Sequence, residues 1–129
     1  MAWSYGFNAD RSNSSRAKAT LKKVEARLKK GWNILIFPEG TRSTTGSLLP
    51  FKRGGFKLAL ATGCPIVPCY IDGSDRIVQK KSLRAQPGTV HLRFAPPILP
   101  SEDASNVDTI RKQTFAIIDG LKPNQSVND

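Results

Sequence analysis

Short apolar runs alternate with amphipathic segments along this chain, and the pattern predicts strands and helices in turn. Strands are predicted over residues 5–9, 33–37, 65–71 and 89–95. The runs at 33–37 and 65–71 are nearly free of polar residues, which is typical of strands buried on both faces of a parallel sheet. These two segments are therefore expected at the centre of the fold.

Helices are predicted between these strands from apolar residues spaced three and four positions apart. Residues 16–30 carry one such stripe, and the opposite face is rich in Lys and Arg with Glu25 as its only acid. A short helix is predicted over residues 56–61, and a last helix begins after a cap at Ser105 or Asn106. The basic helix at 16–30 either rests on anionic headgroups or packs on the sheet with its charges in water.

The order of elements predicts an α/β fold: a layered sheet of mostly parallel strands with flanking helices. One domain is expected over residues 1–122, followed by a disordered tail at 123–129. No stretch approaches the eighteen apolar residues that a membrane-spanning helix needs, and the first residues lack the pattern of a signal peptide.

The positive charge of the chain is concentrated in its first half. The net charge is +10, and residues 1–62 hold 12 Lys and Arg against 3 Asp and Glu, whereas residues 63–129 hold 8 against 7. This asymmetry favours an anionic partner, which could be phosphate, nucleic acid or an acidic membrane. Cys64 and Cys69 are five positions apart along an apolar run, and in a strand this odd spacing sends them to opposite faces, so they are expected as buried free thiols.

The loop after the strand at 33–37 carries the most distinctive chemistry, in the sequence PEGTRS. Ligands of layered α/β sheets bind beyond the carboxyl ends of strands, where this loop lies. Gly40 permits close approach of backbone amides, Thr41 adds a donor, and Arg42 offers a planar fork suited to phosphate or carboxylate. Glu39 is placed to orient Arg42. The alternative is a surface turn with a Glu–Arg ion pair.

Two further groups of cations support a ligand site. Lys52 and Arg53 directly precede the glycine-rich start of the short helix, where free amides attract anions. Arg11 follows the strand at 5–9. If the strands are parallel neighbours, Arg11, Arg42 and Lys52 converge on one edge of the sheet and form a phosphate site.

The motif FPEGTRS, followed by FKRGGFKLALATGCPIVP, resembles the glycerophospholipid acyltransferase family, specifically the 1-acylglycerol-3-phosphate (lysophosphatidate) acyltransferases. Asp10-Arg11 followed by SNSSRA and the later GTVHLRFAPPI match the same pattern, so the resemblance covers nearly the whole chain. It implies an enzyme that transfers an acyl group from acyl-CoA or acyl carrier protein to lysophosphatidate and makes phosphatidic acid in phospholipid biosynthesis. No metal or cofactor is implied.

The resemblance also assigns roles to residues. Those that would bind the glycerol phosphate of the acceptor are Arg11, Glu39, Gly40, Thr41, Arg42 and Lys52. Pro68 would belong to an apolar wall near the acyl donor. Because the substrate is a lipid, peripheral association with an anionic membrane surface at the cytoplasmic face is expected, with no nucleic acid as partner.

One part of the family pattern is absent from this sequence. The family uses a His followed five positions later by Asp, upstream of the Arg11 motif, as general base and orienting acid. The single histidine, His91, lies inside a predicted strand with Pro96 five positions on, so no catalytic role is assigned to it. The expectation is an N-terminally truncated chain with little transferase activity. Two alternatives are a non-catalytic remnant that binds lipid phosphate or a partner, and a basic nucleic-acid-binding module.

Overall fold

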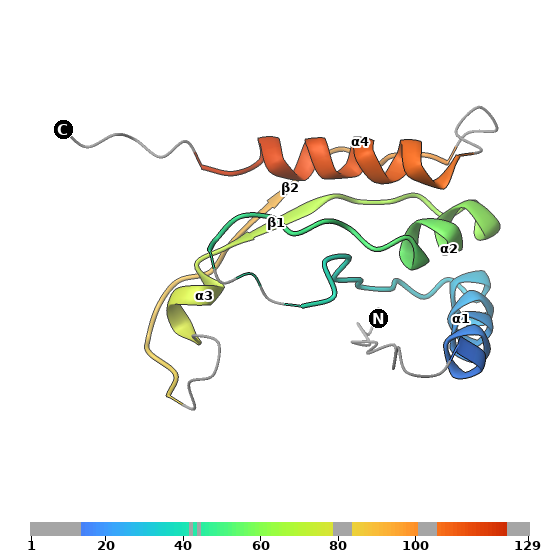
Figure 1. Ribbon diagram of the computed structural model, residues 1–129, viewed down its shortest axis with the longest axis horizontal. Coiled ribbons are helices and arrows are strands. Elements are labelled where there is room, and N and C mark those ends of the chain that lie inside the picture. The colour runs from blue at the N-terminus through green and yellow to red at the C-terminus, as the bar shows by residue number, and fades with distance from the viewer. Residues whose placement is uncertain (1–13, 42, 44, 79–83, 101–105, 124–129) are drawn as a thin grey trace.

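The computed structural model describes the chain except for residues 1–13, 42, 44, 79–83, 101–105 and 124–129. The predicted strand at 5–9 and all but the first residue of the predicted tail at 123–129 lie outside the described residues. The elements, labelled in Figure 1, are α1 (Ser14–Lys29), α2 (Gly54–Thr62), β1 (Cys69–Asp72), α3 (Ser74–Ile77), β2 (His91–Phe94) and α4 (Val107–Gly120). Three predicted helices are confirmed as α1, α2 and α4, whereas α3 lies in a segment for which no helix was predicted.

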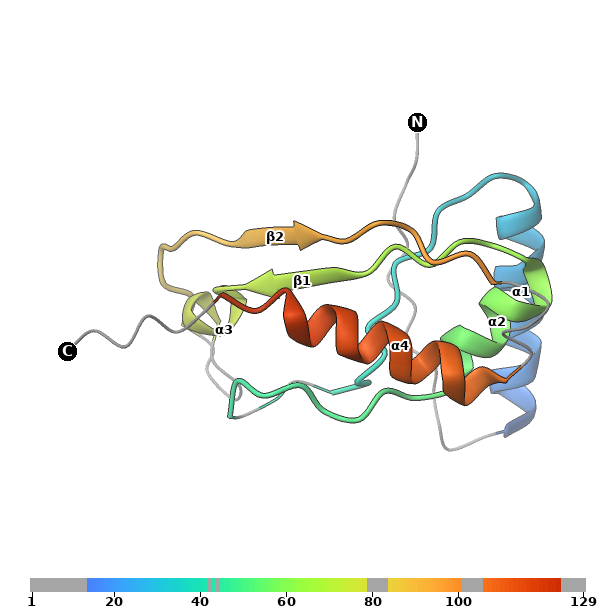
Figure 2. The ribbon, with the colours of Figure 1, turned by 90° about the horizontal axis from the view of Figure 1, so that it is seen from above.

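The sheet in the described residues has two strands. β1 and β2 run antiparallel, with Cys69 opposite Phe94 and Asp72 opposite His91, and they lie side by side in Figure 2. An isolated antiparallel bridge between Ile66 and Ile98 continues the pairing beyond the two strands. The predicted mostly parallel sheet is therefore not observed in this part of the chain. The chain therefore reverses its direction between β1 and β2, as in an antiparallel hairpin.

The predicted strand at 33–37 is wrong for this structure. No strand is assigned between α1 and α2 in the described residues, and the side chains of Leu35, Ile36 and Phe37 are 45%, 42% and 62% exposed. The strand expected to neighbour it, at residues 5–9, lies outside the described residues. A strand needs a hydrogen-bonded neighbour, and an apolar run without one cannot form a ladder. Burial on both faces is also wrong for β1, which is half-buried to exposed along its length.

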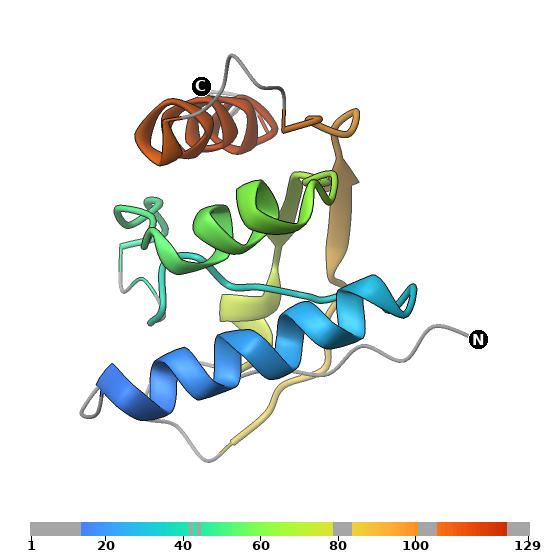
Figure 3. The same cartoon turned by 90° about the vertical axis from the view of Figure 1, so that its right-hand side faces the viewer.

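Three helices are stacked on one side of the molecule. Figure 3 shows α1, α2 and α4 in successive layers, and contacts join α1 to α2 and α2 to α4. The stripe predicted for the first helix explains its packing, because Val24 is buried while Leu21 and Leu28 are half-buried. α1 is thus the outer layer of the stack, and its side chains Lys22, Lys23 and Lys30 are exposed.

The hydrophobic core lies between α2, α4 and the loop before α2. Its buried members are Phe51, Phe56, Ile98, Ile110 and Ile118. The ring of Phe51 stacks against Phe56 with centroids 6.3 Å apart and meets Phe115 edge-on at 5.0 Å. Asn106 caps α4 as predicted, since its side-chain oxygen accepts a hydrogen bond of 2.9 Å from the Asp108 amide.

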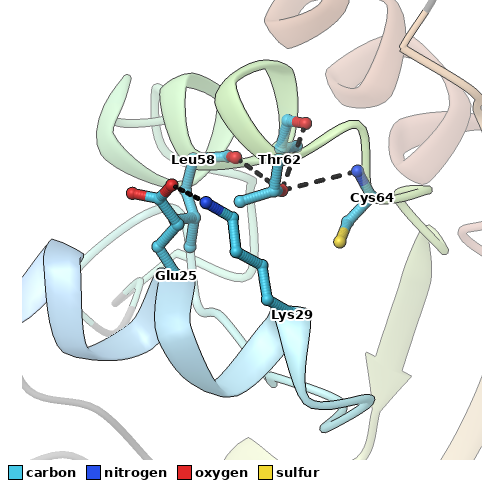
Figure 4. Close-up of polar contacts among 6 residues, drawn as sticks. Glu25, Lys29, Leu58, Thr62 and Cys64 are labelled. Carbon is cyan, nitrogen blue, oxygen red and sulfur yellow. Dashed lines mark hydrogen bonds and ion pairs between the residues drawn. The ribbon is translucent and has the colours of Figure 1, made fainter.

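Polar contacts lie in the last turns of α1 and α2, near the turn that follows α2 (Figure 4). Lys29 Nζ lies 2.8 Å from Glu25 Oε1 on α1. The Thr62 hydroxyl donates to the Leu58 carbonyl at 2.8 Å and accepts from the Cys64 amide at 3.4 Å. Cys64 and Cys69 are free thiols as predicted, although both are half-buried rather than buried. Burial raises the pKa of the Cys69 thiol, and a backbone hydrogen bond from Arg93 partly offsets the rise.

Among the described residues, no helix has both the length and the apolar character needed to cross a bilayer.

Candidate functional site

A tight turn forms the tip of the predicted ligand loop. The Gly40 amide donates to the Phe37 carbonyl at 3.1 Å, which closes a four-residue turn with Pro38 at its second position. Proline favours that position because its φ is already fixed near the required value. Gly40 has a φ of 70°, in the left-handed region where other residues are strained. The sequence thus dictates a sharp reversal directly after the apolar segment.

Two hydrogen bonds join this turn to the segment that carries Lys52. The Lys52 amide donates to the Pro38 carbonyl at 2.7 Å, and the Leu49 amide donates to Glu39 Oε2 at 2.7 Å. The two loops were predicted to share one site from their chemistry alone. The structure brings their backbones into direct contact, although residues 43–48 separate them in the sequence.

Glu39 therefore has a partner that the sequence did not indicate. It was predicted to orient Arg42, but its carboxylate accepts a bond from the backbone of Leu49 and fixes the spacing of the two loops. Arg42 lies outside the described residues, so the Glu39–Arg42 interaction stays a prediction. A half-buried carboxylate bonded to an amide positions the loop, as a helix cap would position a turn.

Lys52 and Arg53 stand at the start of α2, as predicted, and both side chains are exposed. Arg53 occupies the N-cap position without a side-chain hydrogen bond to the helix. Its guanidinium instead lies 3.3 Å from Asp108 of α4. Lys52 forms no ion pair with any described residue, so its ammonium remains available to an anion beside the uncapped amides of the first turn.

The segment before α2 is held from the other side by α4. Arg111 donates from one terminal nitrogen to the Phe51 carbonyl at 3.0 Å and pairs with Asp108 through the other at 3.1 Å. Sequence reasoning missed Arg111 and Asp108. Their spacing of three residues on a predicted helix was a signal for an ion pair, but the bond to Phe51 spans 60 positions.

A glycine allows the apolar segment to approach the start of α2. A Cβ atom built at Gly55 would lie 3.1 Å from Ile36 Cδ1 and 3.2 Å from Cγ2, which is tighter than ordinary contact. Gly54 has open space at the same position. The pair Gly54-Gly55 thus serves close packing as well as access to the helix amides.

The remaining predicted site residues are placed as follows. Thr41 is exposed in the loop after the turn, close in sequence to Gly40. Pro68 is fully buried and its carbonyl accepts a hydrogen bond from the Ala95 amide at 3.0 Å, so it lies beneath the surface rather than on it. Arg11 and Arg42 lie outside the described residues. Of the three cations expected to converge, the structure places Lys52 alone, and their convergence stays a prediction.

His91 was assigned no catalytic role, and that assignment stays a prediction. It lies exposed on β2 opposite Asp72, in an element that contributes nothing to the paired loops.

The turn after the apolar segment is thus bonded to the basic segment at the start of α2. A family model described as Acyltransferase matches residues 2–72, more than half of the chain. The chain belongs to this acyltransferase family, which confirms the resemblance inferred from FPEGTRS.

Proteins similar to this chain have one enzyme name in common. A 1-acyl-sn-glycerol-3-phosphate acyltransferase of Cocos nucifera is 47% identical over 90 residues, which cover 69% of this chain and 29% of that protein. The alpha form of that enzyme from Mus musculus is 32% identical over 115 residues, covering 84% and 40%. The crystal structure of a 1-acyl-sn-glycerophosphate acyltransferase from Thermotoga maritima matches with a TM-score of 0.75 and 33% identity, covering 82% of this chain and 44% of that one.

The chain thus spans less than half the length of each of these relatives.

Proposed function

We propose that this chain provides the acceptor-binding part of a 1-acylglycerol-3-phosphate acyltransferase. In this proposal Arg11, the loop from Glu39 to Arg42, and Lys52 hold the glycerol phosphate. The observation that supports it most is the hydrogen bond from the Lys52 amide to the Pro38 carbonyl, because it joins two segments that were each predicted to bind phosphate. An unpaired ammonium beside uncapped helix amides is the environment that a phosphate monoester prefers.

The reaction that follows is acyl transfer from a thioester. The free hydroxyl of 1-acylglycerol-3-phosphate attacks the carbonyl of acyl-CoA or acyl-carrier protein, a C–O bond forms, and the C–S bond breaks. A base accepts the hydroxyl proton, and the thiol leaves with phosphatidic acid as the other product. Pro68 would support the apolar wall on the donor side from beneath.

The 129 residues lack a histidine in the position that the base requires. His91, their single histidine, is on β2 and has Pro96 rather than Asp five positions on. We therefore propose that this polypeptide alone binds the acceptor but transfers acyl groups slowly. Binding and positioning still lower the barrier without the base, but general-base assistance typically contributes about 10²–10⁴-fold.

Two wider features belong to the same proposal. The extended apolar segment before the turn would act as a strand of a larger, mostly parallel sheet in the whole protein. The chain would associate peripherally with an anionic membrane at its cytoplasmic face, because both the acceptor and the product are lipids.

The binding proposal can be tested with a soluble acceptor. Titration calorimetry would compare hexanoyl-lysophosphatidate with hexanoylglycerol, which lacks the phosphate. Loss of a charged contact costs about 1.5–3 kcal/mol, so Arg42→Ala should weaken binding of the phosphate compound more than tenfold. Arg42→Lys should restore only part, because one ammonium cannot make the planar fork.

Lys52→Ala should also weaken binding, whereas Lys112→Ala on the exposed side of α4 serves as the control. Equal affinity of the unchanged chain, Arg42→Ala and Lys52→Ala would remove the phosphate site. Separately, rapid turnover of acyl-CoA and lysophosphatidate by the 129-residue chain would contradict the proposal that it transfers acyl groups slowly.

A further inference from the structure

We propose that the outer face of α1 docks flat on an anionic lipid bilayer, with Lys22, Lys23 and Lys30 toward the headgroups and Trp32 beside them at the interface. This inference rests on the proposed function, because it identifies the surface through which a lipid-binding chain meets its membrane. It is carried by observations on α1 that the acceptor site does not use.

The charges of α1 are gathered on the side away from the core. Val24 is buried against the stack, whereas Lys22, Lys23 and Lys30 are exposed. At 3.6 residues per turn these three lysines lie on the side opposite the buried stripe. Arg27 is exposed as well, on the flank between these lysines and Val24.

Few carboxylates neutralise the positive charge of α1. Glu25 is the only acid between residues 19 and 30, and its carboxylate is paired with Lys29 at 2.8 Å. Lys22, Lys23 and Lys30 have no carboxylate partner among the described residues. A face with three unneutralised lysines is complementary to the negative surface of an anionic bilayer.

Trp32 supplies a second, independent observation. It follows the end of α1 directly and is 41% exposed, and the guanidinium carbon of Arg27 lies 5.7 Å from its ring centroid. Indole rings are enriched at membrane interfaces, because an apolar ring and a polar N–H suit the headgroup level. The cation over the ring holds the exposed indole against the last turns of α1.

The position of α1 in the fold makes this face accessible. α1 is the outer layer of the stack in Figure 3, with α2 between it and α4. An approaching flat surface therefore reaches the lysines and Trp32 without any rearrangement of the helices. Residues 16–30 were predicted either to rest on headgroups or to keep their charges in water, and Trp32 favours the first.

The test measures partitioning of the full 129-residue chain onto vesicles by sedimentation. Vesicles of phosphatidylcholine with 30% phosphatidylglycerol are compared with pure phosphatidylcholine, and neither contains lysophosphatidate. Each basic residue near an anionic surface contributes about fivefold, so the triple variant Lys22→Gln, Lys23→Gln, Lys30→Gln should lose about 100-fold in partition coefficient. Glutamine keeps the helix propensity of lysine, so the helix remains.

The matched control removes three exposed cations elsewhere, as Arg76→Gln, Arg93→Gln and Lys112→Gln. It has the same net charge as the first triple variant and should lose only a few-fold. An equal loss in both triple variants would mean that net charge alone attracts the chain, and the docking face would be wrong. Strong binding to pure phosphatidylcholine, or tighter binding to duplex DNA than to the anionic vesicles at the same salt concentration, would also overturn it.

Two further arms sharpen the test. Trp32→Ala should weaken partitioning about tenfold and leave its salt dependence unchanged, because the indole contributes contact area rather than charge. The α1 triple variant should bind hexanoyl-lysophosphatidate as the unchanged chain does, while Lys52→Ala should lose that ligand but keep its vesicle binding. These variants separate the two proposals, so that either can fail while the other holds. Loss of both vesicle binding and hexanoyl-lysophosphatidate binding in the α1 triple variant would contradict the docking face.

Discussion

The loop that carries the family motif and the apolar segment that leads into it are held in very different ways. The turn at Pro38–Gly40 is bonded to residues 49–52, and that segment is bonded in turn to α4 through Arg111. The apolar segment at 32–37 has no ladder in the described residues and leaves Phe37 62% exposed.

This difference shows that the candidate site does not depend on the sheet for its shape. The contacts that shape its described part are hydrogen bonds among loops and one helix, whereas its predicted members Arg11 and Arg42 lie outside the described residues. The apolar segment and β2, by contrast, present side chains that only a further surface can bury, since Leu92 and Phe94 are 55% and 63% exposed. The turn and residues 49–52 are therefore held in place without a strand ladder beside them.

The largest expected difference between the two regions is in stability, and it is measured by truncating the same residue type in both. Phe51 is 4% exposed and contacts Phe56 and Phe115, whereas Phe94 is 63% exposed. Phe51→Ala should lower the free energy of unfolding by about 3–5 kcal/mol, because it leaves a cavity under the site. Phe94→Ala should change it by at most about 0.5 kcal/mol. Urea unfolding followed by circular dichroism measures both.

If Phe51→Ala leaves too little folded protein to measure, Phe51→Leu tests the same point with a smaller loss. Similar losses of unfolding free energy from Phe51→Leu and Phe94→Leu would contradict the distinction between the packed segment under the site and the exposed side chains of β2.

The sequence predicted the parts of this structure that depend on local pattern. The apolar stripe of α1 and the Asn106 cap of α4 are both found, because spacing and capping act within a few residues. FPEGTRS and FKRG were correctly linked to one family. The cations of the site were chosen from chemistry alone, and of these the structure places Lys52 at the helix start.

What the sequence could not reveal depends on distant partners. The run at 33–37 has the composition of a buried strand, but composition does not supply a neighbour to pair with. α3 is a single turn of four residues without an apolar period of its own. Glu39 was read as the partner of Arg42, since nothing local indicates the Leu49 amide ten positions away. Arg111 was missed for the same reason.

The contact between the two loops gives the next prediction, of intermediate size. Glu39→Ala removes the acceptor of the Leu49 amide and should lower the free energy of unfolding by about 1–2 kcal/mol, since the bond is charged but half-exposed to water. Glu39→Gln keeps an oxygen at the same place and should restore part of the loss. Amide hydrogen exchange should show faster exchange at Leu49 and a smaller change at Lys52, which is bonded to Pro38 instead.

Glu25→Gln on α1 is the control, because it removes a carboxylate that pairs with Lys29 and has no contact with the loops among the described residues. Unchanged exchange at Leu49 in Glu39→Ala would show that the carboxylate does not fix the spacing of the loops.

The smallest expected effect separates the two glycines at the start of α2. Alanine is favoured over glycine in a helix by about 0.5–1 kcal/mol, and both positions have ordinary backbone angles. At Gly54 the new methyl group meets open space, so Gly54→Ala should stabilise the chain. At Gly55 it meets Ile36 at 3.1 Å, so the propensity gain should be cancelled and Gly55→Ala should be less stable than Gly54→Ala by about 1 kcal/mol.

Shortening Ile36 completes this test. Ile36→Val removes Cδ1, the nearest atom, and should recover part of the deficit when it is combined with Gly55→Ala but not with Gly54→Ala. Thermal unfolding of the unchanged chain, Ile36→Val, Gly55→Ala and their combination forms a double-mutant cycle for the contact. A coupling energy of zero would mean that the apolar segment at 32–37 does not pack against α2 in solution. Its link to the candidate site would then be limited to the hydrogen bonds of the turn at Pro38–Gly40.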